Sequence, residues 1–193
     1  MCINKCATAY ITGRKLKVVA KYEGLIRKTK WQPDNKVTRN KIDPLINKLV
    51  TSNGSLTKSL MELGTEFSVN ILSQNLALPL NHEQILLSRP LQKRAIVREV
   101  ELNVDENIVV FARSILPLSL IKKTQTGLAN LGQKPLGHLL FKKGEMRVSK
   151  RQFAIMNHQG RVIFARRTPY EYMDSTILVS EYFLPNVERL LTK

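Results

Sequence analysis

The sequence predicts an α+β fold, a single domain built on a six-stranded antiparallel sheet with helices packed on one face. Three observations support this prediction. Six segments alternate apolar and polar residues with the period of a strand. Most neighbouring segments are joined by short links, which favour antiparallel pairing. The helical segments are grouped before and between the blocks of strands, an arrangement typical of α+β domains.

Two short helices are expected before the first strand. The first begins at Asp43, a favourable N-cap residue, with Pro44 at the first helical position. The second begins after Ser55 as its N-cap and ends near Gly64. A further helical region is expected over residues 117–141, between the two blocks of strands.

The expected strands follow one another along the chain and are separated by turn residues. The first is followed by an irregular connection over residues 74–92. A turn at residues 105–107 is short enough to make a hairpin, and further turns are expected at residues 157–160 and 173–175. The six strands are expected over residues 66–73, 95–104, 108–116, 146–156, 162–172 and 177–184.

Composition limits the class of protein. The chain has 193 residues, of which 43% are hydrophobic and 24% charged, values typical of one globular domain. No apolar run approaches the ~20 residues of a membrane span. Cys2 and Cys6 have no matching group of cysteines or histidines, so we expect no metal site and a reducing compartment. Residues 1–42 are basic and are expected to form a poorly defined N-terminal extension, without the pattern of a transit or secretory peptide.

The formal net charge of +16 raises the question of a nucleic-acid partner. The basic residues, however, are mostly lysines spread along the whole chain, without interleaved aromatic residues or a recognisable binding motif. We therefore expect no nucleic-acid partner. The same positive charge would attract small anionic substrates.

Two charged residues stand in apolar rows of predicted strands. Arg98 shares its face of one strand with Val100, and Glu181 shares its face of another with Phe183. Either the two form a buried ion pair, or they line a polar cavity that binds a ligand with a carboxylate and a hydroxyl. The planar fork of an arginine suits a carboxylate. Alternation alone leaves both interpretations open.

Six motifs together resemble those of the chorismate lyase family, whose members are also called chorismate pyruvate-lyases. No single motif is diagnostic, but all six occur in the order and spacing of that family. The resemblance covers about residues 43–186, which leaves the N-terminal extension and a C-terminal tail of residues 187–193 outside the matched domain. The motifs are GSLTKSL (54–60), REVEL (98–102), VFARSILP (110–117), LGQKPLGHLLF (131–141), FARRTP (164–169) and VSEYFLP (179–185).

The resemblance implies a fold and a set of pocket residues. Members of the family form one α+β domain on a six-stranded antiparallel sheet. Their substrate-binding residues correspond here to Leu56, Arg98, Leu136 and Glu181. Arg98 and nearby backbone N–H groups would hold the ring carboxylate, and Glu181 would meet the ring hydroxyl, so Arg98 and Glu181 are the candidate catalytic residues. Leu56 stands where other members carry methionine, a nearly volume-conserving exchange.

The resemblance also implies an activity. The expected enzyme is a carbon–oxygen lyase that converts chorismate to 4-hydroxybenzoate and pyruvate without a cofactor, as a monomer that feeds quinone biosynthesis. The match looks nearest to members from cyanobacteria and algal plastids, which implies a location in the plastid stroma, or otherwise the cytoplasm. The alternative is a non-catalytic protein of the same fold that binds or senses an aromatic acid. The sequence leaves open whether hydrogen transfer is concerted or uses acid–base catalysis.

Two further groups of residues have side chains that are common in active sites. Arg166 and Arg167 are neighbours on a predicted strand, so at most one can face the pocket. Arg167 is the candidate for a contact with the enolpyruvyl carboxylate, and the alternative is a solvated strand arginine. No role is assigned to the histidines, because none lies in a context typical of a catalytic base. These are His82, His138 and His158.

Overall fold

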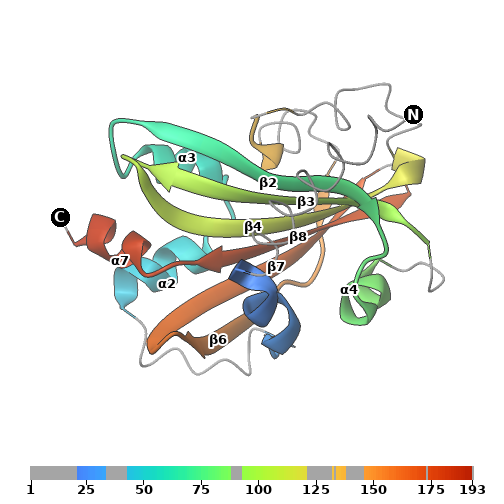
Figure 1. Cartoon of the computed structure of the whole chain (residues 1–193), viewed down its shortest axis with the longest axis horizontal. Helices are drawn as coiled ribbons and strands as arrows, with labels where there is room; N and C mark the ends of the chain where they lie inside the picture. Colours follow the sequence, from blue (N-terminus) through green and yellow to red (C-terminus); the bar gives the residue numbers. More distant parts are fainter. Residues whose placement is uncertain are drawn as a thin grey trace, which may run out of the picture.

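The fold is seen in a computed structural model, which describes residues 21–33, 43–87, 93–120, 132, 134–137, 146–172 and 174–192. The strands of these residues form one antiparallel sheet (Figure 1). Its order is β1-β6-β7-β8-β4-β3-β2, and β5 also pairs with β7. The strands are β1 (Gln32–Pro33), β2 (Phe67–Ala77), β3 (Ala95–Val104), β4 (Asn107–Pro117), β5 (Arg147–Val148), β6 (Gln152–His158), β7 (Arg161–Tyr172) and β8 (Ser175–Phe183).

The predicted fold class is confirmed, with eight strands in place of six among the described residues. Six strands are long, and β1 and β5 have two residues each. The strand predicted over residues 146–156 is divided into β5 and β6, which pair with separate parts of β7. The division lies near Pro169 of β7, which has no N–H to donate to the ladder.

The predicted connection over residues 74–92 is wrong in two places. Strand β2 continues to Ala77, and helix α4 (Asn81–Leu86) follows it. The register of β2 against β3 shifts between Ile71 and Ser73. A bulge of this kind interrupts the alternation of apolar and polar side chains. The alternating pattern therefore ends before the strand itself ends.

The predicted hairpin between β3 and β4 has a two-residue turn. Asp105 and Glu106 both have positive φ, 46° and 63°, and the flanking residues pair directly. Such a turn matches the right-handed twist of the strands. The Asp105 carboxylate also accepts hydrogen bonds from the backbone N–H groups of Thr65 and Glu66, at 2.8 and 2.9 Å. The turn therefore anchors the segment that leads from the helices into β2.

Helices α2 (Pro44–Thr51), α3 (Leu56–Met61) and α7 (Asn186–Leu191) pack in one core cluster with strand residues of one sheet face. The expected starts of α2 and α3 are confirmed. Asp43 accepts a hydrogen bond from the N–H of Leu45 at 2.8 Å, and Ser55 accepts one from Lys58 at 3.4 Å. Apolar residues of all three helices, including Ile46 and Leu60, are buried there.

The other face of the sheet is covered as well, although helices were expected on one face only. A helix over residues 21–28 packs Tyr22 and Leu25 in a cluster with Phe111 and Tyr182. The Tyr22 and Phe111 rings are stacked with centroids 4.1 Å apart. Leu87, next to α4, belongs to a second cluster on this face. Residues 21–33 of the predicted extension therefore contribute to the core, and the rest of it lies outside the described residues.

Candidate functional site

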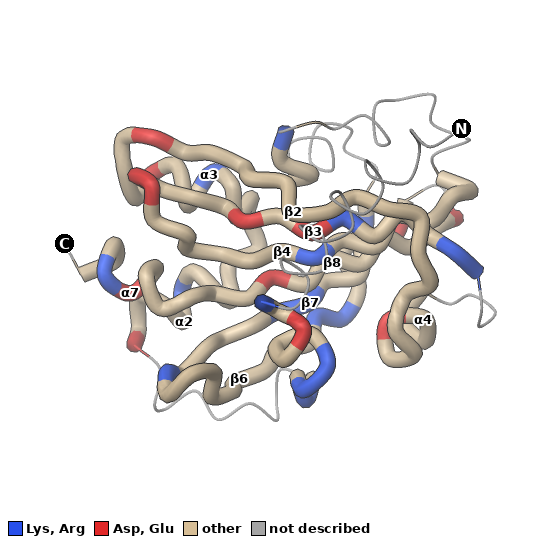
Figure 2. The backbone as a smooth tube through the Cα atoms, in the orientation of Figure 1, with Lys and Arg blue, Asp and Glu red and all other residues tan. Residues whose placement is uncertain are grey.

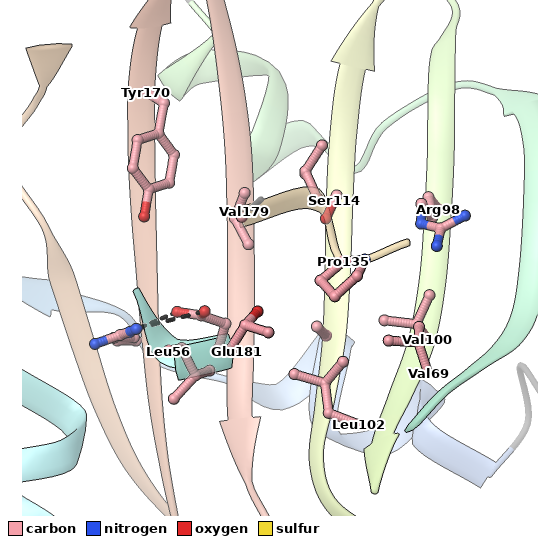
Figure 3. Close-up of a pocket in the computed structure, with 15 residues that line it drawn as sticks. Leu56, Val69, Arg98, Val100, Leu102, Ser114, Pro135, Tyr170, Val179 and Glu181 are labelled. Atoms are coloured by element: carbon pink, nitrogen blue, oxygen red, sulfur yellow. Dashed lines mark hydrogen bonds and ion pairs between the residues drawn. The ribbon is translucent and has the colours of Figure 1, made fainter. Parts of the chain in front are cut away.

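A cavity lies between the sheet, helix α3 and residues 135–137 (Figure 3). Its polar lining comes from Thr57, Arg98, Ser114, Arg166, Tyr170 and Glu181. The remaining lining residues described are apolar or glycine: Leu56, Val69, Val100, Leu102, Ala112, Pro135, Leu136, Gly137 and Val179. The cavity therefore combines apolar walls with a few charged groups, as small-molecule sites commonly do.

Arg98 reaches this cavity because alternation along β3 turns its side chain to the same face as Val100. The residue is only 2% exposed. Its guanidinium donates to Gln74 Oε1 at 2.6 Å and to the carbonyl oxygens of Gly132 and Lys134 at 2.8 and 3.4 Å. Burial lowers the pKa of Arg98. No carboxylate of the described residues pairs with it, so a buried cation faces the cavity with neutral partners only.

Glu181 enters the cavity from β8 and has a charged partner on the neighbouring strand. Arg166 of β7 lies directly across from it in the ladder. Arg166 Nε donates to Glu181 Oε2 at 2.5 Å, and Nη2 donates to Oε1 at 3.4 Å. Burial lowers the pKa of Arg166, but the charge and hydrogen bond of Glu181 outweigh it, so the pKa is raised. The two residues form a buried, fork-shaped ion pair.

The hypothesis of an Arg98–Glu181 ion pair is wrong. In the sheet Arg98 lies opposite Ser114, whereas Glu181 lies opposite Ala112, and β4 separates their strands. Two strand spacings of about 4.8 Å and an offset of two residues therefore separate the two backbones. Figure 3 shows the two charged groups at opposite sides of the cavity. This is the arrangement that the alternative interpretation, a polar ligand cavity, predicted.

The structure brings four predicted pocket residues together. Leu56, the first residue of α3, and Leu136 both line the cavity and are 7% and 9% exposed. Arg98 and Glu181 complete the set. Leu56 and Leu136 come from segments far apart in the sequence, so they meet only because α3 and residues 135–137 approach the same sheet face.

Arg167 does not line the cavity. Its side chain leaves β7 on the other face, where Nε donates to Gln152 Oε1 at 2.6 Å and Nη1 lies 2.9 Å from His82 Nδ1. Its guanidinium also lies over the Trp31 ring, 4.7 Å from the centroid. Arg166 is the neighbour that faces the cavity. The pairing of β7 with β8 could have indicated this, because Tyr172 pairs with Ser175 and the same register places Arg166 opposite Glu181.

Ser114 and Tyr170 also line the cavity, and sequence reasoning did not select them. Both are buried, at 4% and 5% exposed. Burial raises the pKa of the Tyr170 hydroxyl, and the nearby charge of Glu181 adds to this effect. Ser114 was missed because the ladder of β3 and β4 shifts between Leu102 and Asn103, which changes the residue that lies opposite Arg98.

The opposite face of β3 is buried rather than solvated. Alternation along β3 places Glu99 and Glu101 together on this face, and they are 2% and 5% exposed. Arg113 pairs with Glu99 and with Glu83 of α4, at 2.5 and 2.7 Å. Glu101 accepts a hydrogen bond from the Tyr22 hydroxyl at 2.6 Å. These acidic residues hold the covering helices on the sheet and take no part in the cavity.

Comparison with known proteins decides the family. The family model described as chorismate lyase matches residues 25–193. The chain belongs to the chorismate lyase family. This confirms the resemblance and the expectation of a carbon–oxygen lyase, and it extends the matched region to the helix over residues 21–28.

Relatives of the chorismate lyase family agree with this assignment. A probable chorismate pyruvate-lyase of Methylococcus capsulatus is 34% identical over 151 residues, 72% of this chain and 93% of the relative. Another, from Aromatoleum aromaticum, is 33% identical over 172 residues, 80% of this chain and 92% of the relative. Both relatives are bacterial proteins.

Solved structures share the fold of this chorismate lyase family member at low identity. The effector domain of PhnF from Mycobacterium smegmatis has a TM-score of 0.51 and 12% identity, covering 69% of this chain and 90% of that domain. The longer PhnF structure has a TM-score of 0.51 and 11% identity, covering 90% and 95%. These likenesses concern the fold alone. Within the described part of the chain, no helix is long and apolar enough to span a membrane.

Proposed function

We propose that the protein is a chorismate pyruvate-lyase that converts chorismate to 4-hydroxybenzoate and pyruvate. The observation that carries the proposal is the pair of opposite charges, Arg98 and Glu181, at separate positions in one buried and largely apolar cavity. A ring with a carboxylate on one side and a hydroxyl on the other suits this arrangement. Membership of the chorismate lyase family supports it independently.

Each charged group has a defined role in binding. The Arg98 guanidinium donates hydrogen bonds to the ring carboxylate of the substrate, because it is a buried cation without a carboxylate partner among the described residues. Glu181 accepts a hydrogen bond from the ring hydroxyl. Leu56 and Leu136 contact the ring and exclude water. A dry, preorganised site strengthens both polar contacts relative to water.

The reaction is an internal redistribution of atoms, so that substrate and products have the same composition. The ether bond between the ring and the enolpyruvyl group breaks, and the ring carbon that bears the hydroxyl loses its hydrogen. The enolpyruvyl methylene carbon gains a hydrogen and becomes the methyl group of pyruvate. Formation of the aromatic ring drives the change, so that placement and electrostatics are the tasks left to the protein. No cofactor is required for this balance.

The second carboxylate of chorismate has no assigned partner. Arg167 is not proposed for this contact, because its side chain lies on the other face of the sheet. The positive net charge of +16 favours the approach of a dianion from any direction. Figure 2 supports this general role, since lysines and arginines are spread over several elements.

The wider context is proposed from the family resemblance. The product would feed quinone biosynthesis, and the protein would act as a monomer without a nucleic-acid partner. A plastid location stays a prediction, and the relatives named above are bacterial. The second candidate function is non-catalytic binding of an aromatic acid. The similarity to the PhnF effector domain favours it at the level of the fold.

The test uses purified protein incubated with chorismate in the presence of a chelator. Chromatography measures 4-hydroxybenzoate and pyruvate, beside the Arg98→Ala variant. Equal amounts of both products from the wild type, absent from the variant, are expected. Intact chorismate together with saturable binding of 4-hydroxybenzoate would instead favour the binding protein.

A further inference from the structure

Arg166 contacts both Glu181 and the end of helix α2. It is 1% exposed and stands on β7 directly opposite Glu181 of β8. Its Nε and Nη2 atoms both donate to the Glu181 carboxylate, at 2.5 and 3.4 Å. Two donors fix the plane of a carboxylate as well as its position. The rotamer of Glu181 is therefore set from the neighbouring strand.

The third nitrogen of Arg166 points to the end of helix α2. Nη1 donates to the carbonyl oxygens of Leu49, Val50 and Ser52, at 3.4, 3.1 and 3.0 Å. Carbonyl groups at the end of a helix lack partners within it and carry partial negative charge. The guanidinium thus connects Glu181 with the segment that leads from α2 into α3, where Leu56 lines the cavity.

We propose that Arg166 is a positioning residue of this site, which holds the Glu181 carboxylate in a buried ion pair and in one orientation, so that it accepts a hydrogen bond from the ring hydroxyl of the substrate. The proposal rests on the lyase function proposed above.

Other charged and titratable groups near Glu181 must be considered in a pH-dependent test. Tyr170 of β7 and Arg151, next to β6, both interact electrostatically with Glu181, and Arg98 lies across the cavity. Arg151 donates to the carbonyls of Thr51 and Ser52 at 3.3 and 2.8 Å, without a hydrogen bond to Glu181. Because Arg151 also interacts with Glu181, the control is Arg161, an exposed arginine at the start of the same strand β7.

The experiment compares Arg166→Met and Arg161→Met, with circular dichroism to establish that each variant folds. In Arg166→Met the buried carboxylate loses its only described ion-pair partner, and loss of a nearby opposite charge favours the protonated form. We expect kcat to fall steeply toward low pH in Arg166→Met, with KM for chorismate little changed. The profile of Arg161→Met should keep the wild-type shape. Matching profiles for Arg166→Met and the wild type would overturn the proposal.

A second variant covers the case in which Arg166→Met does not fold. Arg166→Lys keeps the positive charge but loses the fork, so kcat should fall roughly 10- to 100-fold through misplacement of Glu181. Arg161→Lys should keep the wild-type kcat. Wild-type kcat in Arg166→Lys would equally overturn the positioning role.

A readout without turnover separates this proposal from the lyase function. Infrared spectroscopy of Arg166→Met should show a protonated carboxyl band that disappears in Arg166→Met/Glu181→Gln and is absent from the wild type at the same pH. If the wild type fails to convert chorismate while this band appears, the lyase function fails and the control of Glu181 by Arg166 stands. If the wild type is active and the band is missing, the lyase function stands and the control of Glu181 by Arg166 fails.

Discussion

The Arg98 guanidinium and the Glu181 carboxylate face one buried cavity from β3 and β8, and each is bonded to partners other than the opposite charge. Arg98 has neutral oxygen partners, whereas Glu181 has Arg166. The two sides of the cavity therefore differ in charge balance. The cation of Arg98 has no counter-charge among the described residues, whereas the charge of the Glu181 carboxylate is balanced by Arg166. An anionic group of a ligand is favoured beside Arg98 and disfavoured beside Glu181.

Replacing Arg98 by lysine should separate charge from geometry. Lysine keeps a positive charge but cannot present two parallel N–H donors to a carboxylate. Loss of one charge-assisted hydrogen bond costs about 1.5–3 kcal/mol, so the affinity for 4-hydroxybenzoate should fall roughly 10- to 150-fold. Isothermal titration calorimetry measures this affinity. Arg94→Lys, at an exposed position just before β3, is the control, and an equal loss in both variants would contradict the assigned contact.

Glu181→Gln should keep the fold and slow turnover. Glutamine has nearly the same shape but only one carbonyl oxygen and no charge, so it is a poorer acceptor for the substrate hydroxyl. If Glu181 takes part in hydrogen transfer, kcat should fall by about 100-fold or more. Single-turnover kinetics would measure the chemical step. Glu188→Gln, on the exposed side of α7, should be unaffected, and full activity in Glu181→Gln would exclude the role.

Gly64 should not tolerate a side chain. A methyl group at this position would overlap the Asp105 carboxylate and the Val104 side chain in the β3–β4 hairpin. Such overpacking costs about 1–3 kcal/mol, which urea unfolding of Gly64→Ala would measure as a lower midpoint. At Gly54 the nearest atom to an added methyl is Ser52 Oγ at 3.5 Å, an ordinary contact. Gly54→Ala should therefore lie close to the wild type, and equal midpoints for both variants would disprove the close approach.

Arg113→Leu should destabilise the protein without changing the cavity. Arg113 pairs with Glu83 and Glu99, and its removal leaves two buried carboxylates without an ion-pair partner among the described residues. Breaking a buried pair in this way costs about 3–5 kcal/mol. Chemical unfolding would measure the loss, with Arg147→Leu on the exposed strand β5 as the control. The affinity of the folded variant for 4-hydroxybenzoate should equal that of the wild type, since Arg113 does not line the cavity.

Stability should fall in mild acid because of His82. Burial lowers the pKa of His82 from its ordinary value of 6.5; Glu83 opposes the shift, and Arg167 and Arg113 add to it. The folded state therefore binds fewer protons than the unfolded state just below pH 6.5, so this contribution to stability is present above that pH and lost below it. The loss cannot exceed about 1.4 kcal/mol per pH unit for one proton.

Thermal melts followed by circular dichroism over this pH range would measure the effect of His82. Arg167 Nη1 lies 2.9 Å from His82 Nδ1, so protonation at this nitrogen would bring two cations together. In His82→Asn the side-chain oxygen can accept from Arg167 without titrating. The variant should lose less stability than the wild type as the pH falls. Identical slopes would show that other groups cause the acid sensitivity.

Alternation along single strands predicted the parts of the site that depend on one strand alone. The faces of Arg98 and Glu181 follow from their own neighbours, and so does the placement of Arg166 and Arg167 on opposite faces. Alternation does not predict which residue of the neighbouring strand lies opposite a given residue. The β3–β4 register contains a shift, so the residue opposite Arg98 is Ser114 and could not be counted from the turn. Arg167 was predicted to face the cavity, but Arg166 does, because the β7–β8 register that places Arg166 opposite Glu181 was not known from the sequence.

The second covering layer was missed for a different reason. In the helix over residues 21–28, the residues Tyr22, Leu25 and Ile26 have helical spacing, but lysines and arginines surround them and conceal the short apolar stripe. The pattern of β3 alone places Glu99 and Glu101 on a polar face, and the helix helps to bury that face. Burial of a strand face depends on a segment distant in the sequence, which the pattern of the strand itself does not contain.

The edge of the sheet at β1 has a consequence for self-association. An open strand edge presents unpaired N–H and C=O groups, and a strand of another molecule can add to it. Here the outermost pairing is only two residues long and ends on Pro33, which has no N–H to offer. Strand β1 therefore offers few backbone groups to which a strand of another molecule could pair. In a concentrated solution this end of the edge should contribute little to intermolecular strand addition.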